Sequence, residues 1–288
     1  MVRVMRSLPY TIMTLPAVVL FFYFHTLPAL QGMFYSFTNW NGFGPVNFIG
    51  LKNYIGLFQD PQVLHSYAFT FEFAIVTTIL VNILSLMIAL ALNSRIKFSK
   101  TFKAIYFLPY VLSTLIVGFI FNYIFSNVIP QVAQQLHIIA LTQNILGTGF
   151  AWVGIVIVAA WQGAAFNTIL YLAGLQTIPE DVYEASSIDG ASPWINFWQI
   201  TFPLIAPFFT INMVLAAKTY LQVFDQIVAL TNGGPGEATQ SVTFVIYTNG
   251  LGGGEFAYQS ANSVVYLIVL VTVALIQIRI LQRREMQF

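Results

Sequence analysis

Six stretches of mostly apolar residues, each about 20 residues long or longer, divide this 288-residue chain. They lie at approximately 9–36, 69–93, 102–126, 149–175, 202–228 and 260–281. About 20 apolar residues are what an α-helix needs to cross the hydrocarbon core of a bilayer. Only 7% of the residues are charged, against about 25% in ordinary soluble domains. The sequence therefore predicts an all-α, polytopic integral membrane protein with six transmembrane helices, forming one domain over residues 1–288.

The first apolar run follows Arg3 and Arg6, as the apolar part of a signal peptide would. It is long, and no convincing small-residue cleavage site precedes the polar segment Asn39–Trp40–Asn41, so we expect a retained helix. The chain has no cysteine, which leaves no basis for a disulfide framework or a metal-thiolate site. The net charge of +1 argues against a nucleic-acid partner.

The basic residues predict the orientation, because positive charge near helix ends stays on the cytoplasmic side. With both termini in the cytoplasm, nine of the eleven Lys and Arg residues fall inside the cell: Arg3, Arg6, Arg95, Lys97, Lys100, Lys103, Arg279, Arg283 and Arg284. The loop between the fourth and fifth runs contains no Lys or Arg. Its predicted cytoplasmic side therefore depends on the number of spans alone.

That loop carries four of the ten acidic residues of the chain: Glu180, Asp181, Glu184 and Asp189. Thr177 and Glu180 have the spacing of a capping box, which predicts that a helix begins here. Gly190 predicts its end, since glycine adopts the left-handed closing conformation without strain. Ser192 and Pro193 can begin a second short helix. We expect a helical hairpin.

One stripe of the first hairpin helix would carry Glu180, Glu184 and Ser187. Such a stripe offers carboxylates and small side chains to a soluble partner. The alternative is a loop that is merely solvated, as loops between helices commonly are.

The hairpin resembles a known family signature. Residues Glu184–Ala191, with Phe197, Ile200, Pro203 and Pro207 at the expected distances, resemble the EAA motif of permease subunits of bacterial ABC importers. Ser186 replaces the second alanine, a small-for-small change. The segments Leu230–Pro235 and Phe48–Tyr54 are similar to the carbohydrate-uptake, maltose-permease-like branch of that family.

The resemblance implies a set of partners in the bacterial cytoplasmic membrane. These are a second homologous permease, two ATPase subunits that hold ATP and magnesium, an extracellular solute-binding protein and membrane lipid. The chain itself would have no catalytic residue, cofactor or metal. Residues 177–203 would be the cytoplasmic coupling hairpin, and residues 229–259 an extracellular loop.

The resemblance implies a role for several residues of the coupling hairpin. Glu184 would make the charged contact with the ATPase, next to Ala185 and Glu180. Gly190 would permit the turn, and Asp189 would help to hold its geometry. Movement of the ATPase pair would then rock the two permeases between inward-open and outward-open states.

Polar residues inside the apolar runs are candidates for the substrate path, because each is costly in lipid. In the fifth run, Lys218, Gln222 and Asp225 have helical spacing on one stripe. The same run contains further hydrogen-bonding and aromatic side chains suited to a sugar: Tyr220, Phe224 and Asn212. The fourth run offers Gln162, Asn167 and Tyr171. The alternative is that these groups join helices to one another.

Two other functions fit the sequence less well. A permease of the same family for glycerol 3-phosphate would be expected to place several Arg or Lys in the path, and only Lys218 is available. An ATPase-independent secondary transporter would have no use for the acidic hairpin. No GxxxxGK[ST] phosphate loop is present, and the three histidines are far apart in the sequence. The sequence therefore favours a sugar permease without ATPase activity of its own.

Overall fold

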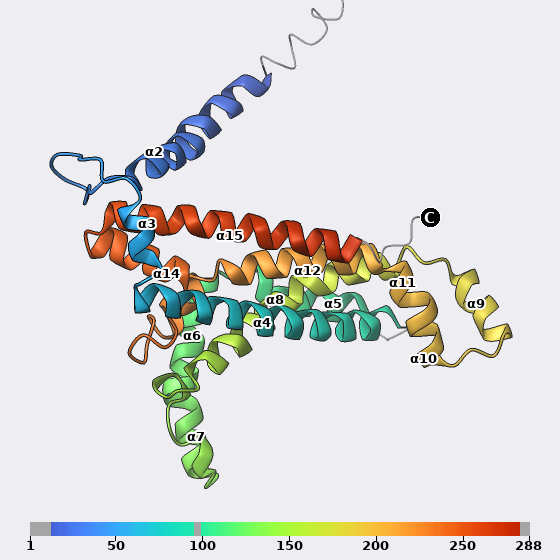
Figure 1. The fold of residues 1–288 in the computed structure, drawn as a ribbon. Helices are drawn as coiled ribbons and strands as arrows, with labels where there is room; N and C mark the ends of the chain where they lie inside the picture. The colour runs from blue at the N-terminus through green and yellow to red at the C-terminus, as the bar shows by residue number, and fades with distance from the viewer. Residues whose placement is uncertain (1–12, 95–98, 283–288) are drawn as a thin grey trace, which may run out of the picture. The chain divides into compact units, whose positions relative to one another are not determined.

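The computed structural model describes residues 13–94 and 99–282. In these ranges all regular elements are helical, and the only β pairing is a single bridge between Thr38 and Phe48 (Figure 1). The all-α prediction is confirmed. The basic residues Arg3, Arg6, Arg95, Lys97, Arg283 and Arg284 lie outside the described residues. The cytoplasmic placement of both termini stays a prediction.

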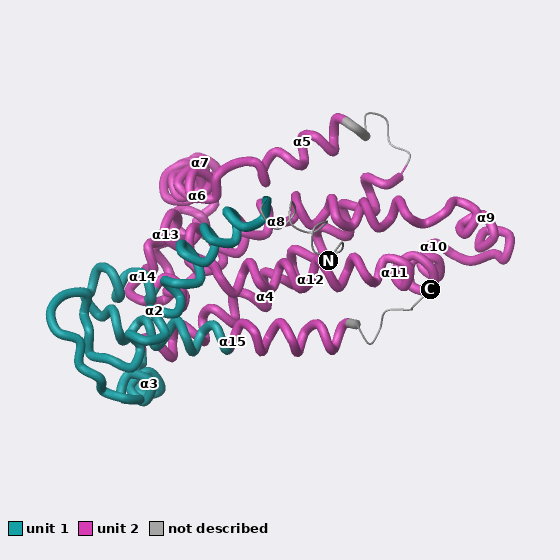
Figure 2. The backbone as a smooth tube through the Cα atoms, turned by 90° about the horizontal axis from the view of Figure 1, so that it is seen from above, with its two compact units in different colours: residues 1–61, 245–268 teal, residues 62–244, 269–288 magenta. Residues whose placement is uncertain are grey.

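The chain divides into two compact units, coloured separately in Figure 2. Unit 1 consists of residues 1–61 and 245–268, and unit 2 of residues 62–244 and 269–288. The helix α15 (Phe256–Gln282) begins in unit 1 and ends in unit 2. The predicted single permease domain over 1–288 stays a prediction.

Unit 1 begins with an apolar helix, Met13–Tyr35. A π-helical turn, η1 (Phe22–Thr26), leads into its last part, α2 (Leu27–Tyr35). The short helix α3 (Lys52–Leu57), the end of α14 (Val242–Tyr247) and the π turn η6 (Thr248–Gly252) follow.

Hydrogen bonds hold the segment after α2 in place within unit 1. The Asn53 side-chain amide donates to the carbonyl oxygens of Ser36 at 2.9 Å and Thr38 at 2.8 Å. The backbone N–H of Ala257 donates to the carbonyl oxygen of Trp40 at 2.9 Å. These bonds order a segment that contains no long helix.

Unit 2 contains the remaining helices. They are α4 (Pro61–Asn93), α5 (Ser99–Val111), α6 (Thr114–Tyr123), η2 (Ile124–Val128), α7 (Ile129–Gln135), η3 (Ile139–Leu141), η4 (Ile145–Gly147), α8 (Ala151–Leu175), α9 (Glu180–Ile188), α10 (Pro193–Ile195), η5 (Asn196–Thr201), α11 (Phe202–Leu204), α12 (Ala206–Leu221) and α13 (Asp225–Leu230). In Figure 2, α9 lies at one end of unit 2, and α6 and α13 lie at the other.

Five helical segments in the described residues are long and apolar enough to cross a membrane. They are Met13–Tyr35, Pro61–Asn93, Thr114–Gln135, Ala151–Leu175 and Phe256–Leu281. A sixth span results if Pro193–Leu204 and Ala206–Leu221, which meet at a 70° bend, are counted as one. The multi-span architecture agrees with the prediction, but two of the predicted runs are not continuous helices.

The predicted third run, 102–126, is interrupted. Helix α5 contains Pro109 and ends at Val111, and Ser113 has extended backbone angles before α6 begins at Thr114. Proline lacks the N–H that an α-helix needs in its interior and clashes with the preceding turn. The apolar stretch that satisfies the length of a span starts only after this break.

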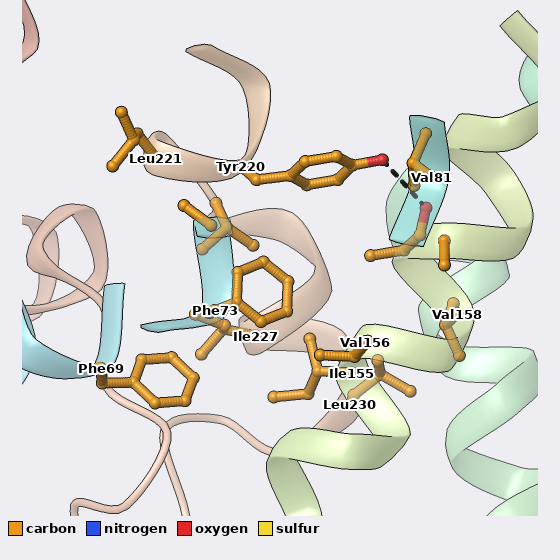
Figure 3. Close-up of a cluster of buried hydrophobic side chains, with 14 of the residues drawn as sticks. Phe69, Phe73, Val81, Ile155, Val156, Val158, Tyr220, Leu221, Ile227 and Leu230 are labelled. Carbon is orange, nitrogen blue, oxygen red and sulfur yellow. Dashed lines mark hydrogen bonds between the residues drawn. The ribbon is translucent and has the colours of Figure 1, made fainter. Parts of the chain in front are cut away.

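The core of unit 2 lies where α4, α8, α12 and α13 meet (Figure 3). Val81, Ile155, Val158 and Ile227 are fully buried there. The Tyr220 hydroxyl donates to the carbonyl oxygen of Ala159 at 3.2 Å, so a buried polar group on α12 is satisfied by α8. Together these contacts hold α4, α8 and α12 against one another.

Candidate functional site

The polar hairpin, residues 177–203, forms two short helical arms. The first arm is α9, and the second runs from α10 through η5 to α11. The hydroxyl of Ser192 accepts a hydrogen bond from the N–H of Ile195 at 3.4 Å, which confirms that Ser192 and Pro193 begin the second arm. The predicted helical hairpin is therefore present.

Gly190 closes α9 with positive φ, as predicted. Its φ is +75°, and its N–H donates to the carbonyl oxygen of Ser187 at 3.2 Å. The next N–H, of Ala191, donates to the carbonyl oxygen of Ser186 at 3.1 Å. These two bonds make a Schellman motif, which requires the left-handed residue at this position. A side chain with a Cβ would strain the turn.

The predicted capping box is wrong. Helix α9 begins at Glu180, and its N-cap is Pro179, which makes no side-chain capping bond. The Thr177 hydroxyl instead donates back to the carbonyl oxygen of Gly174 at 2.7 Å, at the end of α8. Thr177 therefore bonds a carbonyl oxygen in the last turn of α8, where helix carbonyls lack donor partners within the helix. Pro179, with extended backbone angles, forms the start of α9 instead.

Two side-chain contacts join the arms. The Ser186 hydroxyl bonds to Asn196, and the Tyr183 hydroxyl lies 3.1 Å from that of Thr201. Ser186, which stands where the EAA pattern has alanine, is buried. The arms thus form one unit, and Val182 and Tyr183 pack against a cluster of buried side chains at the ends of α4, α8 and α11.

The opposite face of the hairpin is exposed. Glu180, Glu184, Ala185 and Asp189 are all exposed, and Ile188 at the tip is 86% exposed. The exposed face therefore presents carboxylates and one large apolar side chain together. The geometry suits the predicted contact, while the roles of these residues stay predictions.

The predicted stripe on the fifth span is wrong in its geometry. Helix α12 ends at Leu221, residues 222–224 are not helical, and α13 begins at Asp225. Gln222 and Asp225 therefore do not continue the face of Lys218, and all three are exposed. Their roles stay predictions.

Two hydroxyl groups stabilise this break. The side chains of Ser241 and Thr243 donate to the carbonyl oxygen of Val223 at 2.7 and 2.6 Å. A carbonyl oxygen in an apolar region that has no hydrogen bond within a helix needs a donor from elsewhere. Phe224, half-buried beside the break, places its ring 6.5 Å from that of Phe244.

An inner cavity of about 280 Å³ lies between α5, α8 and α12. Two predicted path residues from different helices, Asn167 and Tyr220, line it. The other lining residues are Tyr110, Gly163, Phe166, Leu215, Ala216 and Thr219. The cavity is about the size of the smaller ligand pockets of proteins.

The inner cavity offers both polar and aromatic contacts. The Asn167 amide donates to the carbonyl oxygen of Gly163 at 2.9 Å, and its Oδ1 is buried with no partner in the described part of the chain. The rings of Tyr110 and Phe166 are stacked with their centroids 4.9 Å apart. A free acceptor beside flat rings can bind a ligand that has hydroxyl groups and apolar faces.

The other predicted path residues do not line the inner cavity. The Tyr171 hydroxyl donates to Oδ1 of Asn82 at 2.6 Å, which joins α8 to α4. Asn212 is fully buried in α12, and neither atom of its amide has a partner among the described residues.

Gln162 joins α8 to the break between α5 and α6. Its side-chain amide donates to the carbonyl oxygens of Leu112 at 3.1 Å and Pro109 at 3.4 Å. These carbonyls lie at the end of α5, where a helix leaves its last acceptors unpaired. Gln162 thus stabilises the break. This agrees with the alternative that polar side chains in the apolar runs join helices to one another.

Replacing Gln162 by Leu is expected to destabilise the protein by about 1–3 kcal/mol, because two carbonyl oxygens lose their donor in an apolar setting. The thermal unfolding midpoint of the purified protein in detergent measures the effect. Gln176→Leu is the control, since Gln176 lies exposed at the end of the same helix. Equal midpoints for the two variants would contradict this role of Gln162.

The sequence analysis missed four residues of the inner cavity that matter for its shape: Tyr110, Gly163, Phe166 and Thr219. Asn167 and Tyr220 could be found because polar groups in apolar runs are conspicuous. Within the described ranges, no group of three or more histidine or acidic side chains could hold a metal ion.

Comparisons with known proteins place this fold in a family. Residues 81–287 match the family of binding-protein-dependent transport system inner membrane components. The chain is 36% identical over 280 residues to the multiple sugar-binding transport system permease protein MsmF of Streptococcus mutans serotype c, with 96% of each chain covered.

Two other relatives have different named substrates. The probable starch degradation products transport system permease protein AmyD of Thermoanaerobacterium thermosulfurigenes is 34% identical over 261 residues, covering 91% of this chain and 89% of the relative. The sn-glycerol-3-phosphate transport system permease protein UgpA of Brucella abortus biovar 1 is 31% identical over 282 residues, covering 97% and 96%.

A solved structure has the same fold. It is a bacterial alginate ABC transporter in complex with an alginate pentasaccharide-bound periplasmic protein; one of its chains aligns with a TM-score of 0.83 at 22% identity, covering 98% of this chain and 96% of that chain. The family match covers well over half of the sequence. The chain belongs to the family of binding-protein-dependent transport system inner membrane components, and it is a multi-pass permease subunit of a bacterial ABC importer.

Proposed function

We propose that this permease translocates a neutral oligosaccharide into the cell, and that the sugar passes through the inner cavity. The observation that carries the proposal is the free Oδ1 of Asn167 next to the stacked rings of Tyr110 and Phe166. Sugars present hydroxyl groups at their edges and apolar C–H groups on their faces. Amide and hydroxyl groups suit the first, and aromatic rings suit the second.

The lining of the inner cavity supports a neutral rather than a phosphorylated substrate. None of its lining residues in the described part of the chain is Lys or Arg. Lys218, next to Thr219 on α12, is exposed and is not among them. Recognition of phosphate usually employs Arg or Lys in direct contact. Relatives named for sugars and for glycerol 3-phosphate both exist, and the lining favours the sugar.

The polar hairpin would be the point at which ATPase subunits act on this chain. Its exposed face presents Glu184 and Ile188, while its other face packs through Val182 and Tyr183 against the buried cluster at the ends of α4, α8 and α11. A force applied to the exposed face would therefore pass directly to α8 and α12. ATP and magnesium would be held by two ATPase subunits, and a second, homologous permease would complete the path.

A solute-binding protein outside the membrane would deliver the sugar. The family description names binding-protein dependence, and the alginate importer has been solved with a periplasmic protein bound. Residues 229–259, predicted to be an extracellular loop, contain the whole of α14 and the π turn η6 and are thus not an open loop. We infer that this partly helical segment belongs to the outer face.

Uptake by the complete importer tests this function. The permease is reconstituted in liposomes with its second permease, ATPases and binding protein, and supplied with ATP and either maltotetraose, raffinose or glycerol 3-phosphate. We expect ATP-dependent accumulation of at least one oligosaccharide. Accumulation of glycerol 3-phosphate alone would overturn the proposal.

The same assay tests the inner cavity. Asn167→Leu removes the free acceptor and is expected to raise the KM for uptake about tenfold, the effect of losing one hydrogen bond to a sugar hydroxyl. Asn127→Leu is the control, because Asn127 is exposed on η2 and does not line the inner cavity. An unchanged KM for Asn167→Leu would remove Asn167 from the path.

A further inference from the structure

Unit 2 has a second cavity, the outer cavity, of about 300 Å³. One face of α4 supplies most of its lining, with residues spaced by three or four positions. The first turn of α8 adds Trp152, and the turn after α13 adds Ala238. The residues from α4 are His65, Ala68, Phe69, Glu72 and Phe73.

Glu72 is the acidic residue of this cavity, and its position is unusual for a membrane helix. It is exposed near the start of the apolar run 69–93, and the exposed side of α4 continues with Val76, Ile79 and Ile83. A carboxylate that faces lipid on a membrane-spanning helix is costly, so such residues are candidates to line water-filled spaces and ligand paths. We therefore take the outer cavity to be on the path side of α4.

The lining favours a sugar over an ion. A divalent cation needs about six or more oxygen ligands, and among the described residues that line the cavity Glu72 is the only one with a carboxylate. A phosphate would need basic partners in excess of acidic ones. Three aromatic rings, from Phe69, Phe73 and Trp152, stand beside one carboxylate and one imidazole. Carboxylate and imidazole groups bond hydroxyls, and rings cover the apolar faces of a sugar.

Aromatic contacts connect the outer cavity to the inner one. The ring centroids of Phe69 and Phe73 are 6.0 Å apart, and Phe73 meets the ring of Tyr220 edge to face at 6.1 Å (Figure 3). Phe73 lines the outer cavity and Tyr220 lines the inner one. Phe73 is only 1% exposed, and its ring contact with Tyr220 links the linings of the two cavities. The contacting rings of Phe73 and Tyr220 thus belong to the walls of the two cavities.

We propose that the outer cavity is a second saccharide subsite, which holds one sugar unit of the oligosaccharide before it reaches the inner cavity. Glu72 and His65 bond its hydroxyls, and Trp152 covers one of its faces. The Phe73–Tyr220 ring pair separates this unit from the inner cavity. The inference rests on the proposed sugar transport, and it adds a site that is distinct from the inner cavity.

Site-directed labelling tests this subsite, since the chain contains no cysteine that would have to be removed. Ala68→Cys places a thiol on the lining of the outer cavity, and Thr219→Cys places one in the inner cavity. Each variant is assembled into the complete importer, and its labelling by a hydrophilic maleimide is followed with and without millimolar maltotetraose or raffinose. We expect the transported sugar to slow labelling at Ala68→Cys at least threefold.

A carboxamide variant identifies the binding group. Adding Glu72→Gln to Ala68→Cys is expected to abolish the protection, whereas Glu237→Gln leaves it unchanged, because Glu237 is exposed on the turn and does not line the outer cavity. The Glu72→Gln variant is also expected to raise the KM for uptake of the tetrasaccharide at least fivefold.

The outcomes separate this inference from the function on which it rests. Protection at Thr219→Cys without protection at Ala68→Cys would overturn the outer subsite and leave the sugar path intact. Protection at Ala68→Cys that persists in Glu72→Gln would overturn the assigned binding group. Absence of uptake of both sugars would overturn the proposed function and the subsite together.

Discussion

Glu184→Lys in the complete importer is expected to reduce sugar uptake by about 30-fold or more while the permease remains in the membrane. Glu184 is exposed on the polar hairpin, whose other face packs through Val182 and Tyr183 against buried side chains of α4 and α8. If it meets an ATPase there, reversal of its charge leaves an unpaired partner at an interface, which costs about 2–5 kcal/mol. The measurement is the initial rate of uptake, with the amount of permease in the membrane determined in parallel.

A matched charge reversal provides the control. Glu237→Lys changes an exposed acidic residue on the turn after α13, outside the polar hairpin. We expect uptake within about twofold of the unmodified importer, as surface charges contribute little. Normal uptake by Glu184→Lys would remove the coupling role from this residue.

Gly163→Ala is expected to impair both stability and uptake. A Cβ at Gly163 would stand 1.9 Å from the hydroxyl oxygen of Tyr220, which has to move. The movement breaks the 3.2 Å hydrogen bond to Ala159 and pushes the ring toward the inner cavity. Overpacking of this kind costs about 1–3 kcal/mol. The thermal midpoint and the initial rate of uptake measure the two effects, and we expect about a tenfold lower rate.

A second substitution relieves the clash. In Gly163→Ala/Tyr220→Phe the nearest ring atom is the carbon that carried the hydroxyl, 3.3 Å from the new Cβ. The double variant is expected to be more stable than Gly163→Ala alone, although Tyr220→Phe by itself loses a hydrogen bond worth about 1 kcal/mol. Gly149→Ala, with no atom within 4 Å of the added Cβ, serves as control. Additive effects of the two substitutions would contradict this account.

The sequence predicts the spans well because the bilayer imposes a length and a composition on them. It also contains a signal for the interruption between α5 and α6, since Pro109 lies inside the apolar run. The prediction of one span over 102–126 rested on apolar length alone, and a proline can kink a membrane helix without ending it. The partner that completes the break, Gln162, comes from another helix.

The break after Leu221 has no local signal. Residues 221–225 contain neither glycine nor proline, and their spacing suggests a continuous polar stripe. The hydroxyls that satisfy the freed carbonyl of Val223 belong to Ser241 and Thr243, about 20 residues further along the chain. Tertiary hydrogen bonds therefore decide where this helix ends, and one sequence cannot reveal them.

The polar hairpin is the opposite case. Gly190 and Ser192 act through bonds to backbone groups within a few residues, so their local pattern was sufficient to predict the turn and the second arm. The inner cavity could be predicted only in part from the sequence. Asn167 and Tyr220 could be selected singly, but their meeting depends on the close approach of α8 and α12 at Gly163.

The 70° bend between α11 and α12 has a mechanical consequence. Ile205, at the bend, is fully buried and can act as a pivot, while α12 extends from it for 16 residues, or about 24 Å. A rotation of about 10° at the pivot would displace the far end of such a helix by about 4 Å. That end carries Thr219 and Tyr220, which line the inner cavity, so a small rotation at the bend would displace one wall of this cavity by about the same distance.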